Sequence, residues 1–255
     1  MRCHKISCAP ILKFYHSPRH GVTVYMLLLA TFQLLLHRYT GQDDILVGSP
    51  IAGRTRPEFT KVFGYFTSSV AMRADFAGNP TFIQFLQQVR QTVLDALARQ
   101  DYPFQQIVKQ LQPVRTPNVP PIYQATFALQ QSQLVYERAG PFSSSSLDEP
   151  SIGMKEKLVC ENYPLPMFEG QSDLFLELFD NVDGLVGTLK YHSEIFDEST
   201  IQRMVLHFQT LLTHIVENPN QYIDRCCKNG AEYHQIVHEW RQHRSDGPRE
   251  YPCPL

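Results

Sequence analysis

Two histidines near the C-terminal end of the chain have the spacing of a metal site. His234 and His238 stand four residues apart, as do the two zinc ligands of a helical metalloprotease motif. In that motif the residue after the first histidine is a glutamate that acts as general base, whereas this position holds Gln235. Because no third ligand is evident either, we predict that the chain holds no metal.

A nucleophilic triad is the second chemistry to weigh. Asp173 and His192 could act with a serine, but the sequence has no G-x-S-x-G turn that would present the hydroxyl. The six cysteines form no C-x-x-C pair and show no metal-ligand spacing with histidine. The missing turn argues against a serine hydrolase. The cysteine spacing predicts reduced thiols of a cytoplasmic protein and neither a zinc site nor a disulfide framework.

Composition and charge exclude two classes of partner. The 255 residues carry a formal net charge of -2, so there is no basic field that would attract nucleic acid or anionic lipid. The longest apolar run, residues 24–39, is broken by Thr31 and Gln33, whereas a bilayer span needs about 20 predominantly apolar residues. The first residues also lack the apolar stretch of a secretory signal. We predict a buried helix, no nucleic acid partner, no membrane association and a cytoplasmic location.

Periodic apolar residues predict a mixed α/β or α+β domain with three long helices and four or five strands. Thr23 is placed to cap a helix that runs to about residue 37, and Asn79 with Pro80 to begin a second one. A third long helix is expected over residues 199–217, and a short helix after Pro103. Strands are expected at residues 45–47, 63–73, 122–129, 173–180 and 185–192, the last two as a hairpin.

Three segments of the chain carry a resemblance to a known family. They are YTGQDDILVGSPIAGR at residues 39–54, VFGYFTSSVAMRAD at 62–75 and RQDYPFQQIV at 99–108. Together they resemble the C-terminal half of a condensation domain from a nonribosomal peptide synthetase. The resemblance implies one lobe of a two-lobed, chloramphenicol acetyltransferase-like fold, a mixed sheet packed by long helices. In that family a tunnel between the two lobes admits two phosphopantetheine arms.

The catalytic signature of the family is absent. It consists of two adjacent histidines followed three residues later by Asp-Gly, and no two of the ten histidines here are neighbours. The resemblance therefore implies a chain with no catalytic residue that supplies one tunnel wall and a carrier-docking surface. The histidine-bearing N-terminal lobe would be a missing partner. Peptidyl carrier domains would be further partners, bearing the phosphopantetheine, and the chain would bind no cofactor directly.

The resemblance also divides the chain into three parts. We expect an irregular N-terminal segment over residues 1–20, the C-terminal lobe of a condensation domain over 21–217, and a linker over 218–255. Within the linker, residues 234–252 resemble the segment that leads to a following adenylation domain. An adjacent adenylation domain is thus another implied partner.

Four residues are implied to line the tunnel. Gly64, Tyr65 and Phe66 stand where the family has G-x-F-V-N-T on a strand beside the tunnel, and a glycine there would let a pantetheine arm approach closely. Residues 67–69 replace the Val-Asn-Thr of the family, so the hydroxyl of Ser68 stands in place of an amide side chain.

Other motif residues are implied to be interlobe or structural. Arg54 is a candidate partner for the aspartate of the absent histidine motif, or else a solvated surface arginine. In QDYPF the proline would fix the chain, and the two aromatic rings would either pack in the core or touch substrate. The full set is Arg54, Gln100, Asp101, Tyr102, Pro103, Phe104 and Arg115.

Three functions stay open from the sequence. The first is a part in amide bond formation between carrier-bound aminoacyl or peptidyl thioesters. The second is a catalytically inactive fragment, relic or split subunit that acts only as a protein-interaction module. A coenzyme A-dependent acyltransferase of the same fold is disfavoured, because those enzymes also need the histidine motif.

Overall fold

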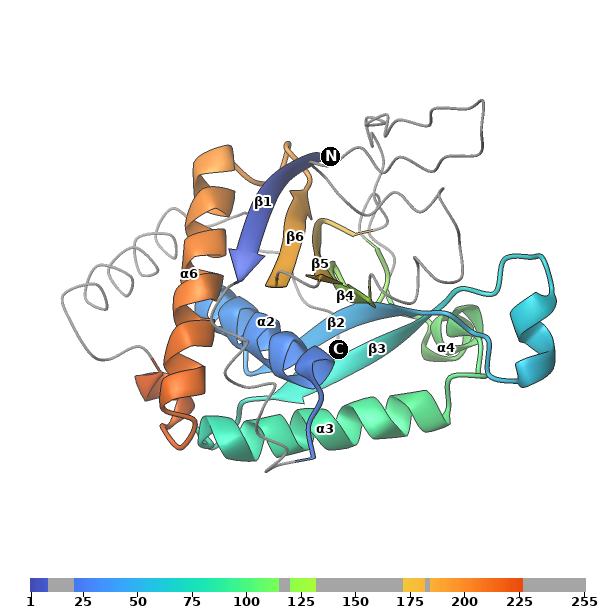
Figure 1. Cartoon of the computed structure of the whole chain (residues 1–255), viewed down its shortest axis with the longest axis horizontal. Coiled ribbons are helices and arrows are strands. Elements are labelled where there is room, and N and C mark those ends of the chain that lie inside the picture. Colours follow the sequence, from blue (N-terminus) through green and yellow to red (C-terminus); the bar gives the residue numbers. More distant parts are fainter. Residues whose placement is uncertain (9–20, 115–119, 132–171, 182–183, 227–255) are drawn as a thin grey trace, which may run out of the picture.

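The computed structural model describes residues 1–8, 21–114, 120–131, 172–181 and 184–226. In this part of the chain, six strands form one mixed sheet in the order β1-β6-β5-β4-β2-β3 (Figure 1). The strands are β1 (Arg2–Cys8), β2 (Asp44–Ile51), β3 (Ser68–Asp75), β4 (Ala125–Gln131), β5 (Leu174–Asn181) and β6 (Gly184–Tyr191). β4 runs parallel to β2 and β5, and the other neighbouring strands are antiparallel. The predicted fold class is confirmed.

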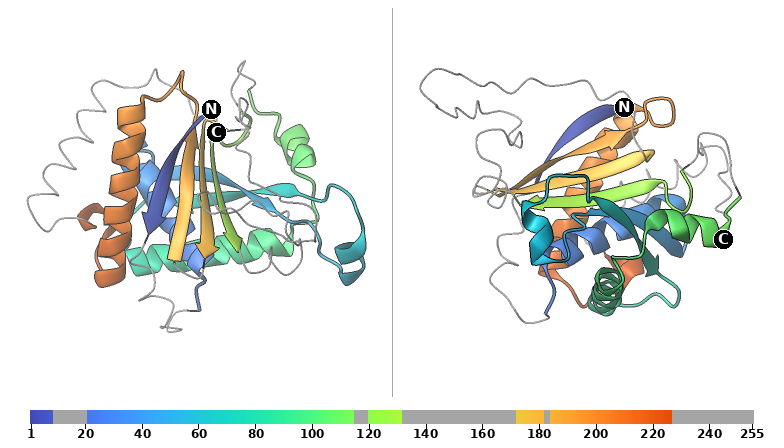
Figure 2. Two further views of the ribbon diagram at one scale, coloured as in Figure 1. Left: turned by 45° about the horizontal axis from the view of Figure 1, so that its top comes forward. Right: turned by 90° about the vertical axis from the view of Figure 1, so that its right-hand side faces the viewer.

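Three long helices pack against one face of this sheet (Figure 2). The helices are α2 (Val24–Thr40), α3 (Phe82–Ala98), α4 (Phe104–Leu111) and α6 (Glu198–Glu217), of which α4 is the short one. In α3 and α6 the apolar residues recur at helical spacing and are buried. The three long helices and the short one were all predicted, within a few residues at each end.

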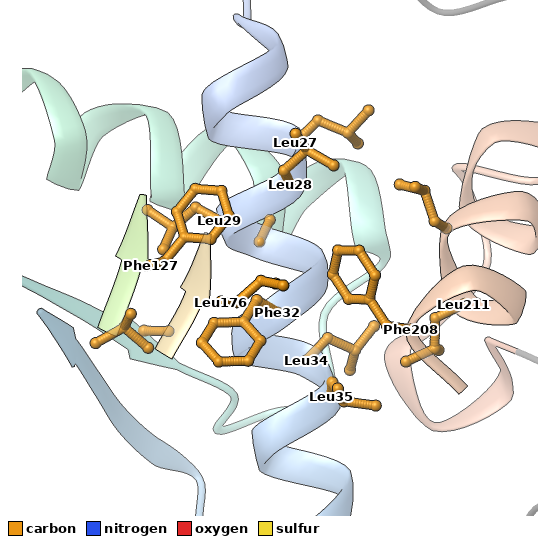
Figure 3. Packing of buried hydrophobic residues seen from close by; sticks show 14 of the residues in the cluster. Leu27, Leu28, Leu29, Phe32, Leu34, Leu35, Phe127, Leu176, Phe208 and Leu211 are labelled. Atoms are coloured by element: carbon orange, nitrogen blue, oxygen red, sulfur yellow. The ribbon is translucent and has the colours of Figure 1, made fainter. Parts of the chain in front are cut away.

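Helix α2 is the centre of the core, as its uniformly apolar sequence predicts. The hydroxyl of Thr23 accepts a hydrogen bond from the backbone N–H of Met26 at 3.3 Å and so caps the helix. At the other end Gly41 has φ 68, the left-handed conformation that favours glycine. Figure 3 shows Phe32 and leucines of α2 packed with Phe127 of β4 and Phe208 of α6. Even Gln33 is buried, and its amide donates to the backbone oxygen of Met72 at 3.0 Å.

The sheet has a second face, which points away from α2, α3 and α6. Successive strand residues alternate between the two faces, and in β5 Leu174, Leu176 and Leu178 are buried in the core. The side chains between them belong to the other face. We define the second face by the residues Gly48, Thr126, Ala128, Phe175, Glu177, Thr188 and Lys190, which lie side by side in the strand register.

The prediction of an irregular N-terminal segment was wrong for residues 2–8. These residues form β1, which pairs antiparallel with β6 from Arg2 opposite Tyr191 to Cys8 opposite Leu185. Ile6 is the buried apolar residue of this strand. Without an alternating apolar pattern, β1 forms because β6 offers it a row of unpaired backbone groups. Residues 9–20 lie outside the described residues.

Two predicted boundaries also need correction. β3 begins at Ser68 and not near residue 63, so residues 63–67 precede the strand. Helix α3 is capped by Thr81, whose hydroxyl accepts from the N–H of Gln84 at 3.4 Å, and not by Asn79. Asn79 instead has φ 49 and turns the chain before the helix, a conformation that asparagine tolerates better than most residues.

The domain was predicted to end at residue 217, but the structure shows that it continues beyond this residue. Residues 218–226, here called the C-terminal strap, run back along the N-terminal end of α3. The backbone N–H groups of Phe82 and Ile83 donate to oxygens of the strap at 2.8 and 3.0 Å. In return the N–H of Ile223 donates to the oxygen of Pro80 at 3.0 Å. Because these are backbone bonds in both directions, the strap is part of the domain.

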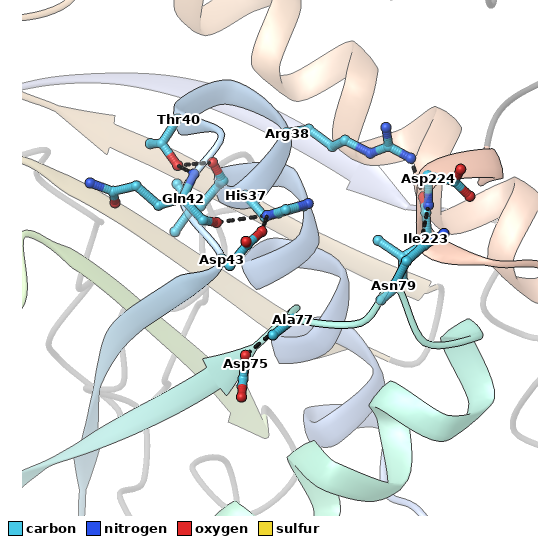
Figure 4. Close-up of polar contacts among 11 residues, drawn as sticks. His37, Arg38, Thr40, Gln42, Asp43, Asp75, Ala77, Asn79, Ile223 and Asp224 are labelled. Carbon is cyan, nitrogen blue, oxygen red and sulfur yellow. Dashed lines mark hydrogen bonds and ion pairs between the residues drawn. The ribbon is translucent and has the colours of Figure 1, made fainter.

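Side chains also hold the C-terminal strap in place (Figure 4). The guanidinium of Arg38, near the end of α2, donates to the backbone oxygen of Ile223. The side-chain oxygen of Asn79 accepts from the N–H of Asp224 at 3.0 Å. Ile223 and Cys226 are buried in the main core. Residues 218–226 therefore belong to the folded domain and not to the predicted linker, and residues 227–255 lie outside the described residues.

Candidate functional site

Arg54 organises the long connection between β2 and β3. Its guanidinium donates to the backbone oxygens of Phe59, of Val62 at 2.9 Å and of Gly64 at 3.3 Å. It also lies 4.4 Å from the centroid of the Phe66 ring, a cation–π distance. Arg54 thus binds the connection to which it belongs, and its pairing with the aspartate of the histidine motif stays a prediction. Arg54 holds the residue 55–66 loop in one shape.

This loop contains three of the four residues implied to line the tunnel. Gly64, Tyr65 and Phe66 precede β3 and are not on a strand, which corrects the prediction of a strand over residues 63–73. Phe63 and Tyr65 are 105% and 88% exposed, so both rings project from the loop. Ser68 is the first residue of β3, opposite Ile51 of β2. A loop that is held by these hydrogen bonds and exposes two aromatic rings offers those rings to another surface.

The QDYPF residues connect α3 to α4. Pro103 is the N-cap of α4, and the N–H of Tyr102 donates to the oxygen of Arg99 at 3.0 Å. Tyr102 is 45% exposed, whereas Phe104 is half-buried with its ring 5.3 Å from that of Tyr123. The motif thus has one packed ring and one exposed ring. Gln100 is half-buried and Asp101 exposed, and Arg115 lies outside the described residues.

Tyr123 is a site residue that the sequence reasoning missed. Its ring lies over Gly48 of β2, where an added Cβ would overlap the ring at well under 3.0 Å. The backbone reaches this place through a γ-turn, since the N–H of Tyr123 donates to the oxygen of Pro121 at 3.0 Å. The central residue of the turn, Ile122, has φ 75, which is strained for a β-branched side chain. Such strain is concentrated at functional sites.

Tyr123 brings two of the family motifs together. Gly48 belongs to the segment that ends in SPIAGR, and the Tyr123 ring lies against it. Phe104 belongs to QDYPF, and its ring packs against the same tyrosine ring. The side chain therefore seats α4 on the second face of the sheet. The sequence signal that could have found it was the glycine inside an otherwise apolar strand, which often marks a close approach by another group.

We expect Gly48→Ala to destabilise the domain by about 1–3 kcal/mol, because the added methyl must displace the Tyr123 ring or the strand. The measurement is urea unfolding followed by circular dichroism. Gly64→Ala is the matched control, since an added Cβ there meets its nearest atom at 3.4 Å. When Tyr123→Ala is combined with the Gly48 substitution, the two effects should fall short of their sum by about 1 kcal/mol. Full additivity would contradict the contact.

The residues considered for a triad are close only through their backbones. The N–H of His192 donates to the oxygen of Asp173 at 3.0 Å. Burial raises the pKa of the Asp173 carboxyl, and the charge on His192 opposes this shift. Nδ1 of His192 is buried and has no hydrogen-bond partner within the described residues. A triad needs that nitrogen to be oriented by a carboxylate, so the geometry does not support one.

The described ranges contain no group of three or more His, Cys, Asp or Glu side chains arranged to hold a metal ion. His234 and His238 lie outside them. None of the helices in these ranges is both long and apolar enough to cross a membrane. The arrangement that the structure does present is the second face of the sheet, bordered by α4, by Tyr123 and by the loop of residues 55–66 that Arg54 binds, here called the Arg54-held loop.

Comparisons with known proteins agree with one another. A family model described as "Condensation domain" matches residues 16–235. One of the linear gramicidin synthase proteins of Brevibacillus parabrevis is 39% identical over 227 residues, which cover 89% of this chain and 4% of that protein. The chain therefore spans only a small part of the length of this relative.

Solved structures show the same fold. A four-domain nonribosomal peptide synthetase bound to AMP and glycine matches with a TM-score of 0.78 at 24% identity, over 87% of this chain and 17% of that one. The X-domain in its complex with OxyB from teicoplanin biosynthesis matches with a TM-score of 0.70 at 20% identity, over 88% of this chain and 46% of that one. In the second structure the match occupies roughly half of the other chain.

Proposed function

Because this chain belongs to the condensation domain family, we propose that it forms one wall of the reaction chamber in which a nonribosomal peptide synthetase joins two carrier-bound thioesters through an amide bond. The observation that carries the proposal is the family match over residues 16–235 together with a fold of the same kind. The wall would comprise the second face with Tyr123 and the Arg54-held loop, and Gly64, Tyr65, Phe66 and Ser68 would line it.

The contribution of this chain is positioning. In the proposed reaction the acceptor amine attacks the donor thioester carbonyl and loses a proton, and a wall that holds both reactants in contact lowers the entropic barrier. The proton-handling group would come from polypeptide outside these 255 residues, since no adjacent histidine pair occurs in them. The partners are peptidyl carrier domains, a histidine-bearing N-terminal lobe and an adenylation domain. The phosphopantetheine belongs to the carriers, and the setting is cytoplasmic.

The proposal that this chain positions the reactants but lacks the proton-handling group is tested with the chain alone. We expect no dipeptidyl carrier when the purified chain is incubated with one carrier loaded with a donor and another loaded with an acceptor amino acid. Intact-protein mass spectrometry of both carriers provides the measurement. Growth of the acceptor carrier by one aminoacyl residue, with no other condensation domain present, would show that the chain has a complete active site of its own.

Protein binding without catalysis is a second candidate function. The observation that favours it is the fold match to a domain solved in complex with another protein, OxyB. The exposed rings of Phe63 and Tyr65 would suit such a role, because aromatic residues are enriched in interfaces. The two candidate functions predict different results when a histidine-bearing half is added, because a chain that only binds proteins would form no peptide with it.

A further inference from the structure

An open groove lies along the outer edge of β3, next to α3. β3 is the last strand of the sheet among the described residues, and α3 extends beneath it (Figure 1). The groove has a volume of about 320 Å³ and is lined by residues 73–75 of β3 and by Phe85, Gln88, Val89 and Thr92 of α3. None of these residues is among those proposed to line the reaction chamber, so the groove is a separate surface.

The groove borders backbone groups of β3 that have no partner strand. The N–H of Phe76 donates to the oxygen of Asp43 at 2.8 Å, so this residue pair of the β2–β3 ladder is a hydrogen-bonded one. Such pairs alternate with non-hydrogen-bonded ones along an antiparallel ladder. The N–H and C=O groups of Arg73 and Asp75 therefore point away from β2, and no other described strand lies beside β3. An edge of this kind is a template for pairing with another chain.

The interior of the groove is apolar, and its rim is polar. Ala74, Phe85 and Val89 are at most 3% exposed, whereas Gln88 is exposed and Thr92 half-buried. If a strand were added to β3, the residue opposite Ala74 would lie on the same face of the sheet as Ala74, and therefore over these apolar side chains. Peptide-binding domains that add a strand to a sheet edge use main-chain hydrogen bonds for affinity and pockets for alternate side chains for specificity. The groove offers both.

Charges beside the groove favour a cationic partner. The guanidinium of Arg73 donates to both carboxylate oxygens of Asp44, at 2.9 and 2.7 Å, so its charge is compensated. Asp75, in contrast, forms no ion pair among the described residues, and one of its oxygens accepts from the N–H of Ala77 at 2.9 Å (Figure 4). A second copy of β3 would bring another Asp75 to this edge and no uncompensated cation. A lysine or arginine from a different protein would supply the missing charge.

We propose that the groove binds an extended segment of a partner protein, which pairs with β3 and carries a lysine or arginine opposite Asp75 and an apolar residue opposite Ala74. Arg73 and Asp75 each provide one N–H donor and one C=O acceptor for this pairing. The carboxylate of Asp75 binds the cation, and hydrogen bonds between charged groups are stronger than neutral ones. The apolar residue packs against Phe85 and Val89, which line the groove.

The test uses the isotopically labelled full chain and, as the probe, a capped hexapeptide of sequence Thr-Lys-Val-Thr-Val-Thr. In 1H–15N spectra we expect the largest shifts over residues 73–75, and slower hydrogen exchange of the Arg73 and Asp75 amides. Asp75→Asn keeps an acceptor for the N–H of Ala77 but removes the charge, and it should weaken the affinity about threefold, as expected for a cross-strand charge pair. Asp95→Asn is the matched control and should leave the affinity unchanged, because Asp95 is exposed on α3 and does not line the groove.

Replacement of the lysine of the peptide by glutamate should weaken binding about tenfold, because a like charge then stands opposite Asp75. Equal affinity of the two peptides would overturn the cationic partner, and shifts without slower exchange of the Arg73 and Asp75 amides would overturn strand pairing. Absence of any shift at millimolar peptide would overturn the site. A dimer of the chain alone in sedimentation equilibrium, with these amides already protected, would show that a second copy occupies the edge instead. Because the shifts are measured on the unsubstituted chain, a variant that fails to fold does not obscure the result.

Discussion

We expect amide bond formation when this chain is joined to a histidine-bearing N-terminal half of another condensation domain. We expect the chimera to produce dipeptidyl carrier at least about 100-fold faster than either half alone, because a positioned general base contributes roughly 10²- to 10⁴-fold and alignment of the reactants contributes further. Intact-protein mass spectrometry of the acceptor carrier over time gives the rate.

Two controls make this reconstitution decisive. Replacement of the second histidine of the added motif by alanine should return the chimera to the level of the separate halves. Circular dichroism and thermal unfolding of the chimera show whether both halves are folded. A folded chimera that forms no peptide while binding both carriers would contradict the role as a wall and favour the protein-interaction module.

Removal of the C-terminal strap is expected to have the largest effect on stability. A chain that ends at residue 217 should be unfolded or severely destabilised, because it loses Ile223 and Cys226 from the core and the backbone bonds at the start of α3. A chain that ends at residue 226 keeps all of these contacts and should be clearly more stable than the chain that ends at residue 217. The measurement is urea unfolding of the two truncated chains side by side.

Single substitutions separate the contribution of the core from that of chain length. Ile223→Ala should cost about 2–5 kcal/mol, the usual range for a buried isoleucine. Tyr222→Ala is the control on the adjacent residue, whose side chain is 51% exposed, and it should change the free energy of unfolding by less than about 0.5 kcal/mol. Equal effects of the two substitutions would contradict the burial of the C-terminal strap.

Cysteine alkylation gives an independent view of the C-terminal strap. Burial raises the pKa of the Cys226 thiol to about 11, and the thiolate is the reactive form. At pH 8 the native chain should therefore be alkylated at exposed Cys3 long before Cys226. In Ile223→Ala the protection of Cys226 should decrease, and unchanged protection would show that the strap remains docked without its isoleucine.

Local patterns were enough to predict most elements of the fold. The helices α2, α3 and α6 and the β5–β6 hairpin each bury a face that can be identified within one segment of sequence. The family motifs likewise lie in continuous segments, so the resemblance was recognisable without a structure. The absence of an adjacent histidine pair from these 255 residues is also a property of the sequence alone.

Elements that depend on distant partners could not be predicted in this way. β1 contains one buried apolar residue, Ile6, and forms by pairing with a strand near the other end of the domain. The C-terminal strap has a polar sequence without a periodic pattern, yet it binds the ends of two helices through Arg38 and Asn79. In both cases the stabilising hydrogen bonds join segments that are far apart in the chain.

The candidate site shows the same division. The sequence by itself determined which motifs are present and that the histidine pair is not among them, because residue identity and order carry that information. Only the tertiary structure decided that Arg54 binds its own loop and that Tyr123 covers Gly48. These contacts depend on how strands and loops come together in space, and each residue alone is compatible with several partners.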